Sequence, residues 1–336
     1  MKNLYKLLFF NLLIMSTLIA ISSLSWMTIW ISLEMNLLAI MPLMKNIKNK
    51  YSAESTIKYF IIQAMASAML LFSIIIYLMT KTINMNLFTY SSILTDSALF
   101  MKMGAAPFHF WLPEIISGMN WEMIFIILTW QKIAPMILLS YSIYTPMFLS
   151  IIIIISSMIS GIQGMNQNCL RKIMAYSSIN HTGWMIAAIM SSLNIWFYYF
   201  IIYSIINLNI LLILNKYQIF YLNQLSKLFS YNKYKKFFFM LNFLSLGGLP
   251  PFLGFLPKWM TINFLISENF YTLSFLLIIF TLMSLYFYMR ITFTTFTLNS
   301  TESLTNIIIK VNYLHFFVNF VSLSSLLLMF CLANFL

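Results

Sequence analysis

Charged residues are scarce in this chain. Only 8% of its 336 residues are charged, whereas 61% are hydrophobic and 18% are aromatic. About a quarter of the residues of an ordinary soluble domain are charged, so no water-soluble fold of this length could hide so much apolar surface. With two cysteines and three histidines, a disulfide framework, a cysteine-held iron–sulfur cluster and a histidine-rich metal site are excluded. We therefore expect a protein of the lipid bilayer.

Valine and arginine are nearly absent, with three and two copies, while isoleucine, phenylalanine, methionine and lysine abound. No property of a membrane favours isoleucine over valine or lysine over arginine so strongly. An AT-rich coding sequence does, so the composition indicates an organellar or otherwise AT-rich genome. The net charge of +12 is more typical of topology signals in a membrane protein than of a nucleic-acid surface.

Apolar stretches long enough to cross a bilayer, which takes about 20 residues, recur along the chain. They predict an all-α polytopic membrane protein of about 11 transmembrane helices, and strand-like alternation is absent. We expect a single membrane domain. The predicted helices cover residues 4–24, 26–44, 57–79, 93–111, 123–143, 147–165, 171–190, 195–215, 237–265, 272–296 and 313–335.

The distribution of lysine and arginine between the loops supports this count. Cationic clusters such as residues 45–50 and 233–236 fall on the same side as the N-terminus, while the other side holds Lys81, with Asp96 and Glu268. By the positive-inside rule, the N-terminus faces the cytoplasm or matrix and the C-terminus lies on the opposite side. The longest linker, residues 216–236, is basic and expected at the membrane surface.

Several ionisable residues lie deep within the predicted helices, and the candidates among them are Glu34, Lys102, Lys132, His181 and Lys258. A charge at the bilayer centre costs roughly 2.5–3.5 kcal/mol even on lenient scales, so these side chains should face the bundle interior. Three lysines and one glutamate cannot all be charged and paired. Because burial disfavours a charged lysine and a nearby carboxylate favours it, the set meets the requirement of a proton relay or a gated ion path.

Simpler roles for these residues stay open. A lysine near a helix end can extend to the membrane interface, Glu34 can be a structural partner of one lysine, and His181 can be a hydrogen-bonded interior histidine. His109 and Glu114, at the end of the fourth helix, are expected near the interface unless they take part.

Two of the predicted helices share a motif that interrupts a helix. Gly104, Pro107, Phe108, Leu112 and Pro113 match Gly248, Pro251, Phe252, Leu256 and Pro257 in spacing, and each motif is followed by a charged residue, Glu114 or Lys258. Proline breaks or kinks a helix, and paired interrupted helices are typical of transporter repeats. Because the motifs lie five helices apart, the copies should be antiparallel. We predict discontinuous helices 4 and 9 in two inverted five-helix repeats, residues 1–145 and 146–298, followed by a C-terminal helix, residues 299–336.

Several segments also resemble a known family. These are SLEMN around Glu34, KMGAAPFHFWLPE from Lys102, TWQKIAP around Lys132, RKIMAYSSINHTGWM from Arg171 and GLPPFLGFLPKW before Lys258. The chain is similar, over nearly its whole length, to the antiporter-like proton-translocating subunits of mitochondrial NADH:ubiquinone oxidoreductase (respiratory complex I), relatives of Mrp-type cation/proton antiporters. The AT-rich composition resembles an insect mitochondrial gene.

The resemblance implies a function and a role for each residue. Glu34 matches an acid that modulates Lys102, the lysine of the first broken helix. Lys132 matches a central connecting lysine, Lys258 the lysine of the second broken helix, and His181 a position on the central polar axis. The alternatives are an Mrp-type cation/proton antiporter subunit and a non-pumping structural membrane subunit.

The resemblance also implies a cellular setting. NADH, FMN, iron–sulfur clusters and ubiquinone belong to other subunits, and this chain has no cofactor or metal. Its partners are other membrane-arm subunits, including antiporter-like ones, accessory subunits and phospholipids such as cardiolipin, with no nucleic acid. The location is the mitochondrial inner membrane, with the N-terminus in the matrix and the C-terminus on the intermembrane-space side.

Overall fold

The computed structural model describes residues 4–45, 49–80, 85–142, 144–228, 233–250 and 252–297. The predicted C-terminal helix lies outside these residues. Regular structure in the described part is helical, and its β pairing is confined to one isolated antiparallel bridge between Cys169 and Tyr221. By its internal contacts the chain divides into two compact units, residues 1–155 (unit 1) and 156–336 (unit 2). The boundary falls within one helix, and the predicted repeat boundary at residue 145 stays a prediction.

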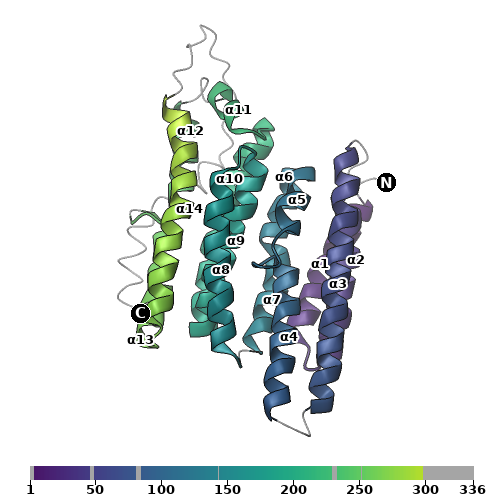
Figure 1. Ribbon diagram of the computed structural model, residues 1–336. Helices are drawn as coiled ribbons and strands as arrows, with labels where there is room; N and C mark the ends of the chain where they lie inside the picture. Colours follow the sequence, from purple (N-terminus) through teal and green to yellow (C-terminus); the bar gives the residue numbers. More distant parts are fainter. Residues whose placement is uncertain are drawn as a thin grey trace. The chain divides into compact units, whose positions relative to one another are not determined.

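Unit 1 is a set of long helices followed by shorter ones (Figure 1). α1, α2 and α3 pack in sequence, α4 packs against α3 and α7, and the short α5 lies on α3. A Cβ atom at Gly118 would lie 2.7 Å from the Tyr51 carbonyl oxygen, so glycine permits the close approach of α5 to α3. The elements are α1 (Leu4–Ser22), α2 (Trp26–Met44), α3 (Lys50–Thr80), α4 (Met85–Met103), α5 (Trp111–Gly118), α6 (Trp121–Leu128), α7 (Trp130–Ser140) and the first half of α8 (Pro146–Met165).

Unit 2 is built around α9. Eighteen of the 22 residues of α9 are buried, because α10, α13 and α14 pack against it. The polar side chains in its middle, from Tyr176 to Thr182, therefore lie inside the unit. The elements after α8 are α9 (Leu170–Ser191), α10 (Leu193–Tyr217), α11 (Leu222–Leu228), α12 (Lys233–Gly247), α13 (Phe255–Ser267) and α14 (Tyr271–Thr297).

Seven helices in the described residues are long and apolar enough to span a membrane. They correspond to the first, second, third, fifth, sixth, eighth and tenth predicted segments. Three more predicted segments are present as helices but fail this criterion for physical reasons. The fourth falls on α4, which has 19 residues but many polar ones, followed by the short α5. The ninth is divided between α12 and α13, of 15 and 13 residues, and the seventh, α9, carries many polar residues.

The fourth segment required a correction. We expected Asp96 near a loop on the side opposite the N-terminus. Instead, α4 begins at Met85, so Asp96 lies well inside the helix and is fully buried. The chain between residues 85 and 92 is polar enough to resemble a loop in sequence, yet it continues the helix because α4 packs along α3.

Candidate functional site

The two interrupted helices have the same backbone plan. α4 ends at Met103 and α12 ends at Gly247. The next residues, Gly104 and Gly248, both have a left-handed backbone, with φ of 73° and 80°. A residue with a Cβ atom adopts this conformation only at a cost, which accounts for a glycine at each break.

The second half of each break also matches. α5 restarts at Trp111 and α13 at Phe255, seven residues after the respective glycine. The first helix of each pair closes with a bond that spans five residues, from Ala105 N–H to the Phe100 carbonyl (3.1 Å) and from Leu249 N–H to the Leu244 carbonyl (3.4 Å). Such a bond is typical of a glycine-terminated helix. The predicted superposition of Pro107 on Pro251 concerns Pro251, which lies outside the described residues.

Lys258 occupies the break in unit 2. Its side chain turns back from the first turn of α13, and its Nζ donates to the Gly247 carbonyl at 2.9 Å and the Leu246 carbonyl at 3.4 Å. These carbonyls belong to the last turn of α12, where helical partners are missing and the helix dipole is negative. Nζ also lies 5.7 Å from the ring centre of Trp184 on α9. A cation that is 6% exposed is thus solvated by backbone and an aromatic face.

In unit 1, the carbonyl groups at the end of α4 accept hydrogen bonds from other donors. Gln63 on α3 donates to the carbonyl of Lys102 at 3.3 Å, and the indole of Trp111 donates to the Met101 carbonyl at 3.1 Å. Lys102 itself precedes the glycine and is 7% exposed. The two lysines therefore lie on opposite sides of equivalent breaks, and only Lys258 binds the open helix end.

Glu34 lies on α2 and is half-buried. It forms no ion pair with Lys102, because the ion pairs among the described residues join Lys58 to Glu54 and to Glu114. The pairing of Glu34 with Lys102, and its role in proton movement, stay predictions.

Lys132 is the most deeply buried of the three lysines, at 1% exposure. It lies in the first turn of α7, next to the interruption at Thr129 that separates α6 from α7. The Thr129 hydroxyl donates to the Phe125 carbonyl at 2.6 Å. One residue before Lys132, the amide of Gln131 donates to Asn36 Oδ1 on α2 at 2.9 Å. Polar groups thus connect α7 to the helix that carries Glu34.

His181 lies in the core of unit 2, at 4% exposure. Its Nδ1 is 2.9 Å from the hydroxyl of Tyr199 on α10, and its ring packs 5.0 Å from the ring of Tyr203. One residue before it, Asn180 donates to Ser284 on α14 at 2.8 Å. The histidine therefore contacts two tyrosines of α10, while the neighbouring Asn180 links α9 to α14.

The residues expected at the interface divide into two cases. Glu114 is exposed and pairs with Lys58 at 3.2 Å. His109 is buried inside the turn between α4 and α5, and its Nδ1 lies 3.3 Å from the Pro107 carbonyl oxygen.

Sequence reasoning missed Tyr199 and Asp96. An aromatic residue among apolar residues gives no signal of a hydrogen bond to a distant helix. Asp96 gave a signal, since it is the sole aspartate of the chain, but the fourth helix was predicted to begin at residue 93, which placed Asp96 near a loop. Among the described residues, no three histidine, cysteine, aspartate or glutamate side chains cluster as metal ligands would. The chemistry available to the lysines, Glu34 and His181 is to hold and transfer protons.

Comparison with known proteins gives clear matches. Residues 23–284 match the family described as NADH:quinone oxidoreductase/Mrp antiporter, transmembrane region. The chain is 43% identical to NADH-ubiquinone oxidoreductase chain 2 of Anopheles gambiae, over 98% of both chains. It is also 43% identical to the chain of the same name in Locusta migratoria, over 100% of this chain and 98% of the relative. These matches confirm the family resemblance predicted from the motifs.

Solved structures show the same fold at lower identity. A chain of respiratory complex I from Thermus thermophilus, solved with bound aureothin, has a TM-score of 0.84 at 21% identity, covering 95% of this chain and 77% of that one. A chain of the Mrp complex from a Dietzia species has a TM-score of 0.74 at 18% identity, covering 83% of this chain and 58% of that one.

Proposed function

The chain belongs to the NADH:quinone oxidoreductase/Mrp antiporter family of membrane proteins, and from this membership we infer that it is a proton-translocating subunit of the membrane arm of an NADH:ubiquinone oxidoreductase. Its near full-length relatives bear the name of chain 2 of that enzyme. The chain contributes to the enzyme as a subunit, and its own part is the movement of protons.

The Lys258 contacts carry the proposal for the site. The Lys258 ammonium group is buried and binds backbone carbonyls and an aromatic ring. Among the described residues it has no carboxylate partner to fix its charge. Such a group can lose its proton without leaving an acid unpaired. We propose that Lys258, Lys132, Lys102, Glu34 and His181 take up and release protons in turn as charges shift elsewhere in the enzyme.

The cellular setting follows as a proposal from the relatives. We place the chain in the mitochondrial inner membrane, with its N-terminus in the matrix and its C-terminus on the intermembrane-space side. Its partners would be other membrane-arm subunits, antiporter-like ones among them, together with accessory subunits and phospholipids such as cardiolipin. NADH, FMN, iron–sulfur clusters and ubiquinone would bind other subunits, since two cysteines cannot ligate a cluster.

The first test is the composition of the purified assembly. The chain should copurify with flavin and iron–sulfur signals, and the assembly should oxidise NADH with a quinone. In vesicles, this oxidation should be accompanied by proton transport. Recovery of the chain in a flavin-free assembly that exchanges sodium for protons would instead favour an Mrp-type antiporter, the second candidate, whose fold is also similar.

The second test concerns Lys258. Lys258→Met keeps the length of the side chain and removes its proton, so the number of protons moved per NADH should fall. Lys45→Met is the matched control because Lys45 is an exposed lysine at the end of α2. If both variants transport protons as the wild type does, Lys258 has only a structural role.

A further inference from the structure

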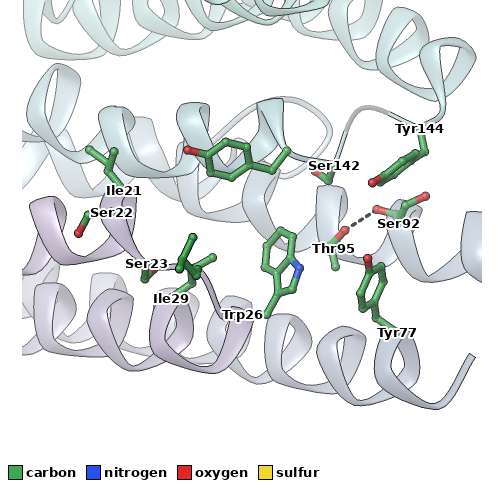
Figure 2. Close-up of a pocket in the computed structure, with 12 residues that line it drawn as sticks. Ile21, Ser22, Ser23, Trp26, Ile29, Tyr77, Ser92, Thr95, Ser142 and Tyr144 are labelled. Atoms are coloured by element: carbon green, nitrogen blue, oxygen red, sulfur yellow. Dashed lines mark hydrogen bonds between the residues drawn. The ribbon is translucent and has the colours of Figure 1, made fainter. Parts of the chain in front are cut away.

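Unit 1 contains a pocket at the helix ends opposite the N-terminus. The pocket has a volume of about 350 Å³ and lies among the α1–α2 connection, α2, α3, α4 and the end of α7. Eight of its twelve lining residues carry a hydroxyl group. Figure 2 shows Trp26 between the serines of the α1–α2 connection, Ser22 and Ser23, and the hydroxyls of α4, Ser92 and Thr95. Since a water molecule occupies about 30 Å³ in the liquid, the pocket has room for several.

Asp96 lies behind the wall of this pocket. Its carboxyl group is fully buried, and Oδ1 is 2.5 Å from the hydroxyl of Ser142, which lines the pocket. Its other oxygen, Oδ2, is buried and has no hydrogen-bond partner. An ionised carboxylate left in this state forgoes several hydrogen bonds and is costly to bury, so the site suits a carboxyl group that gains and loses a proton.

The Ser142 hydroxyl connects the carboxyl group to the pocket. Its oxygen is within hydrogen-bond distance of both Asp96 Oδ1, at 2.5 Å, and the Leu139 carbonyl, at 3.2 Å. A hydroxyl has one hydrogen, so it can donate to only one of them at a time. When Asp96 is protonated, its O–H donates to Ser142 and Ser142 donates to Leu139. When Asp96 is ionised, Ser142 donates to Asp96. One side chain therefore serves both charge states.

Among the described residues, the surroundings of Asp96 supply no fixed countercharge. α3 and α7 pack against α4, and the titratable groups that they and the following turn bring to the pocket are Tyr77, Tyr141 and Tyr144. No lysine, arginine or glutamate lines the pocket, and Asp96 has no ion pair in the part of the chain that the structure describes. The charge of Asp96 is thus free to change without breaking a salt bridge.

We propose that this pocket is a water-filled proton path and that Asp96 is a proton-accepting site at its inner end. In the transfer step, a protonated water in the pocket gives a proton to Ser142 Oγ while the original Ser142 proton moves to Asp96 Oδ1. One O–H bond forms and one breaks on Ser142, a new O–H bond forms on Asp96, and neutral water stays behind. The reverse step releases the proton. This proposal depends on the proposed function in one respect only, namely that the proton on Asp96 is passed on through the rest of the enzyme.

Water access can be tested without any measurement of transport. In the assembled complex in sealed mitoplasts, Ser92→Cys should react with a membrane-impermeant charged methanethiosulfonate added outside, because the reaction needs a hydrated thiolate. Ser67→Cys, buried on α3 but outside the pocket lining, is the matched control, and the wild type measures the background from Cys169 and Cys331. Labelling of Ser92→Cys as slow as that of Ser67→Cys would overturn the water path.

Proton acceptance is tested with Asp96→Asn, which keeps the size and an oxygen acceptor for Ser142 but cannot take up a proton. We expect fewer protons moved per NADH oxidised in vesicles of the assembled complex. Glu268→Gln, an exposed carboxyl group at the end of α13, should match the wild type. Rapid labelling of Ser92→Cys together with wild-type transport in Asp96→Asn would overturn the role of Asp96. Lys258→Met tests the proposed function separately. A failure of the proposed role of Asp96 can therefore be distinguished from a failure of the proposed function.

Discussion

The substitution Gly248→Ala should damage unit 2 in two separable ways. Gly248 has a φ of 80°, and a Cβ atom there would lie 2.8 Å from Cδ and 2.9 Å from Nζ of Lys258. The left-handed backbone costs a residue with a Cβ atom roughly 1–2 kcal/mol. Displacing Nζ from its carbonyls removes charge-assisted hydrogen bonds that contribute about 1.5–3 kcal/mol. Together, the free energy of unfolding should fall by about 2.5–5 kcal/mol.

A double-mutant cycle separates the two contributions. In a Lys258→Ala background the atoms that the new methyl group meets are gone, so Gly248→Ala should cost only the backbone contribution of roughly 1–2 kcal/mol. The assay is the midpoint of thermal inactivation of the assembled complex, with its steady-state amount on native gels. Transport per NADH should fall in Gly248→Ala even in the fraction that assembles, because Nζ has moved.

The cycle has a clear refuting result. Equal costs of Gly248→Ala in both backgrounds would mean that the Lys258 side chain does not lie over the end of α12. The contact of its ammonium group with the freed carbonyls would then be wrong, and with it the observation that carries the proposed function.

Three further variants test other contacts. Tyr199→Phe keeps the ring but removes the hydroxyl 2.9 Å from His181, so proton transport per NADH should fall, whereas Tyr176→Phe on the same helix as the histidine should leave it unchanged. Arg290→Met removes the guanidinium donors to the carbonyls of Met165, the last residue of α8, and of Gln167, which should destabilise the complex by about 1.5–3 kcal/mol in thermal inactivation. Lys58→Met breaks two largely exposed ion pairs and should change the same midpoint little, because such pairs contribute about 0–1 kcal/mol.

The sequence predicted most of the helices because length and hydropathy determine them directly. Predicted boundaries such as 26–44 and 147–165 differ from α2 and α8 by at most one residue. Glycine and proline, which constrain the backbone itself, also located both interruptions. Where a boundary depended on packing, prediction was weaker. α3 begins seven residues before its predicted start at residue 57, since an amphipathic first turn carries little hydropathy signal.

The buried ionisable residues could be identified from the sequence, but their contacts could not. A lysine or glutamate in an apolar segment can be recognised from the sequence as a candidate functional residue, because burying a charge is costly. Its neighbours do not, because they come from helices far along the chain. The hydroxyl of Tyr199 reaches His181 from α10, and Gln63 reaches the end of α4 from α3. Asp96 combined both difficulties. Polar residues hid the first half of its helix from a hydropathy reading, and its hydrogen-bond partner, Ser142, lies 46 residues later in the chain.

The two breaks show that one backbone plan can present its lysine in two ways. Both helices stop at a left-handed glycine and restart seven residues later, so both leave carbonyl groups open at the end of the first helix. In unit 2 the ammonium of Lys258 covers them. In unit 1 the neutral donors of Gln63 and Trp111 bind them instead, and Lys102 lies on the other side of its break. Deprotonation should therefore disturb the backbone of the second break directly and that of the first break hardly at all, so the lysines of the two units are not interchangeable.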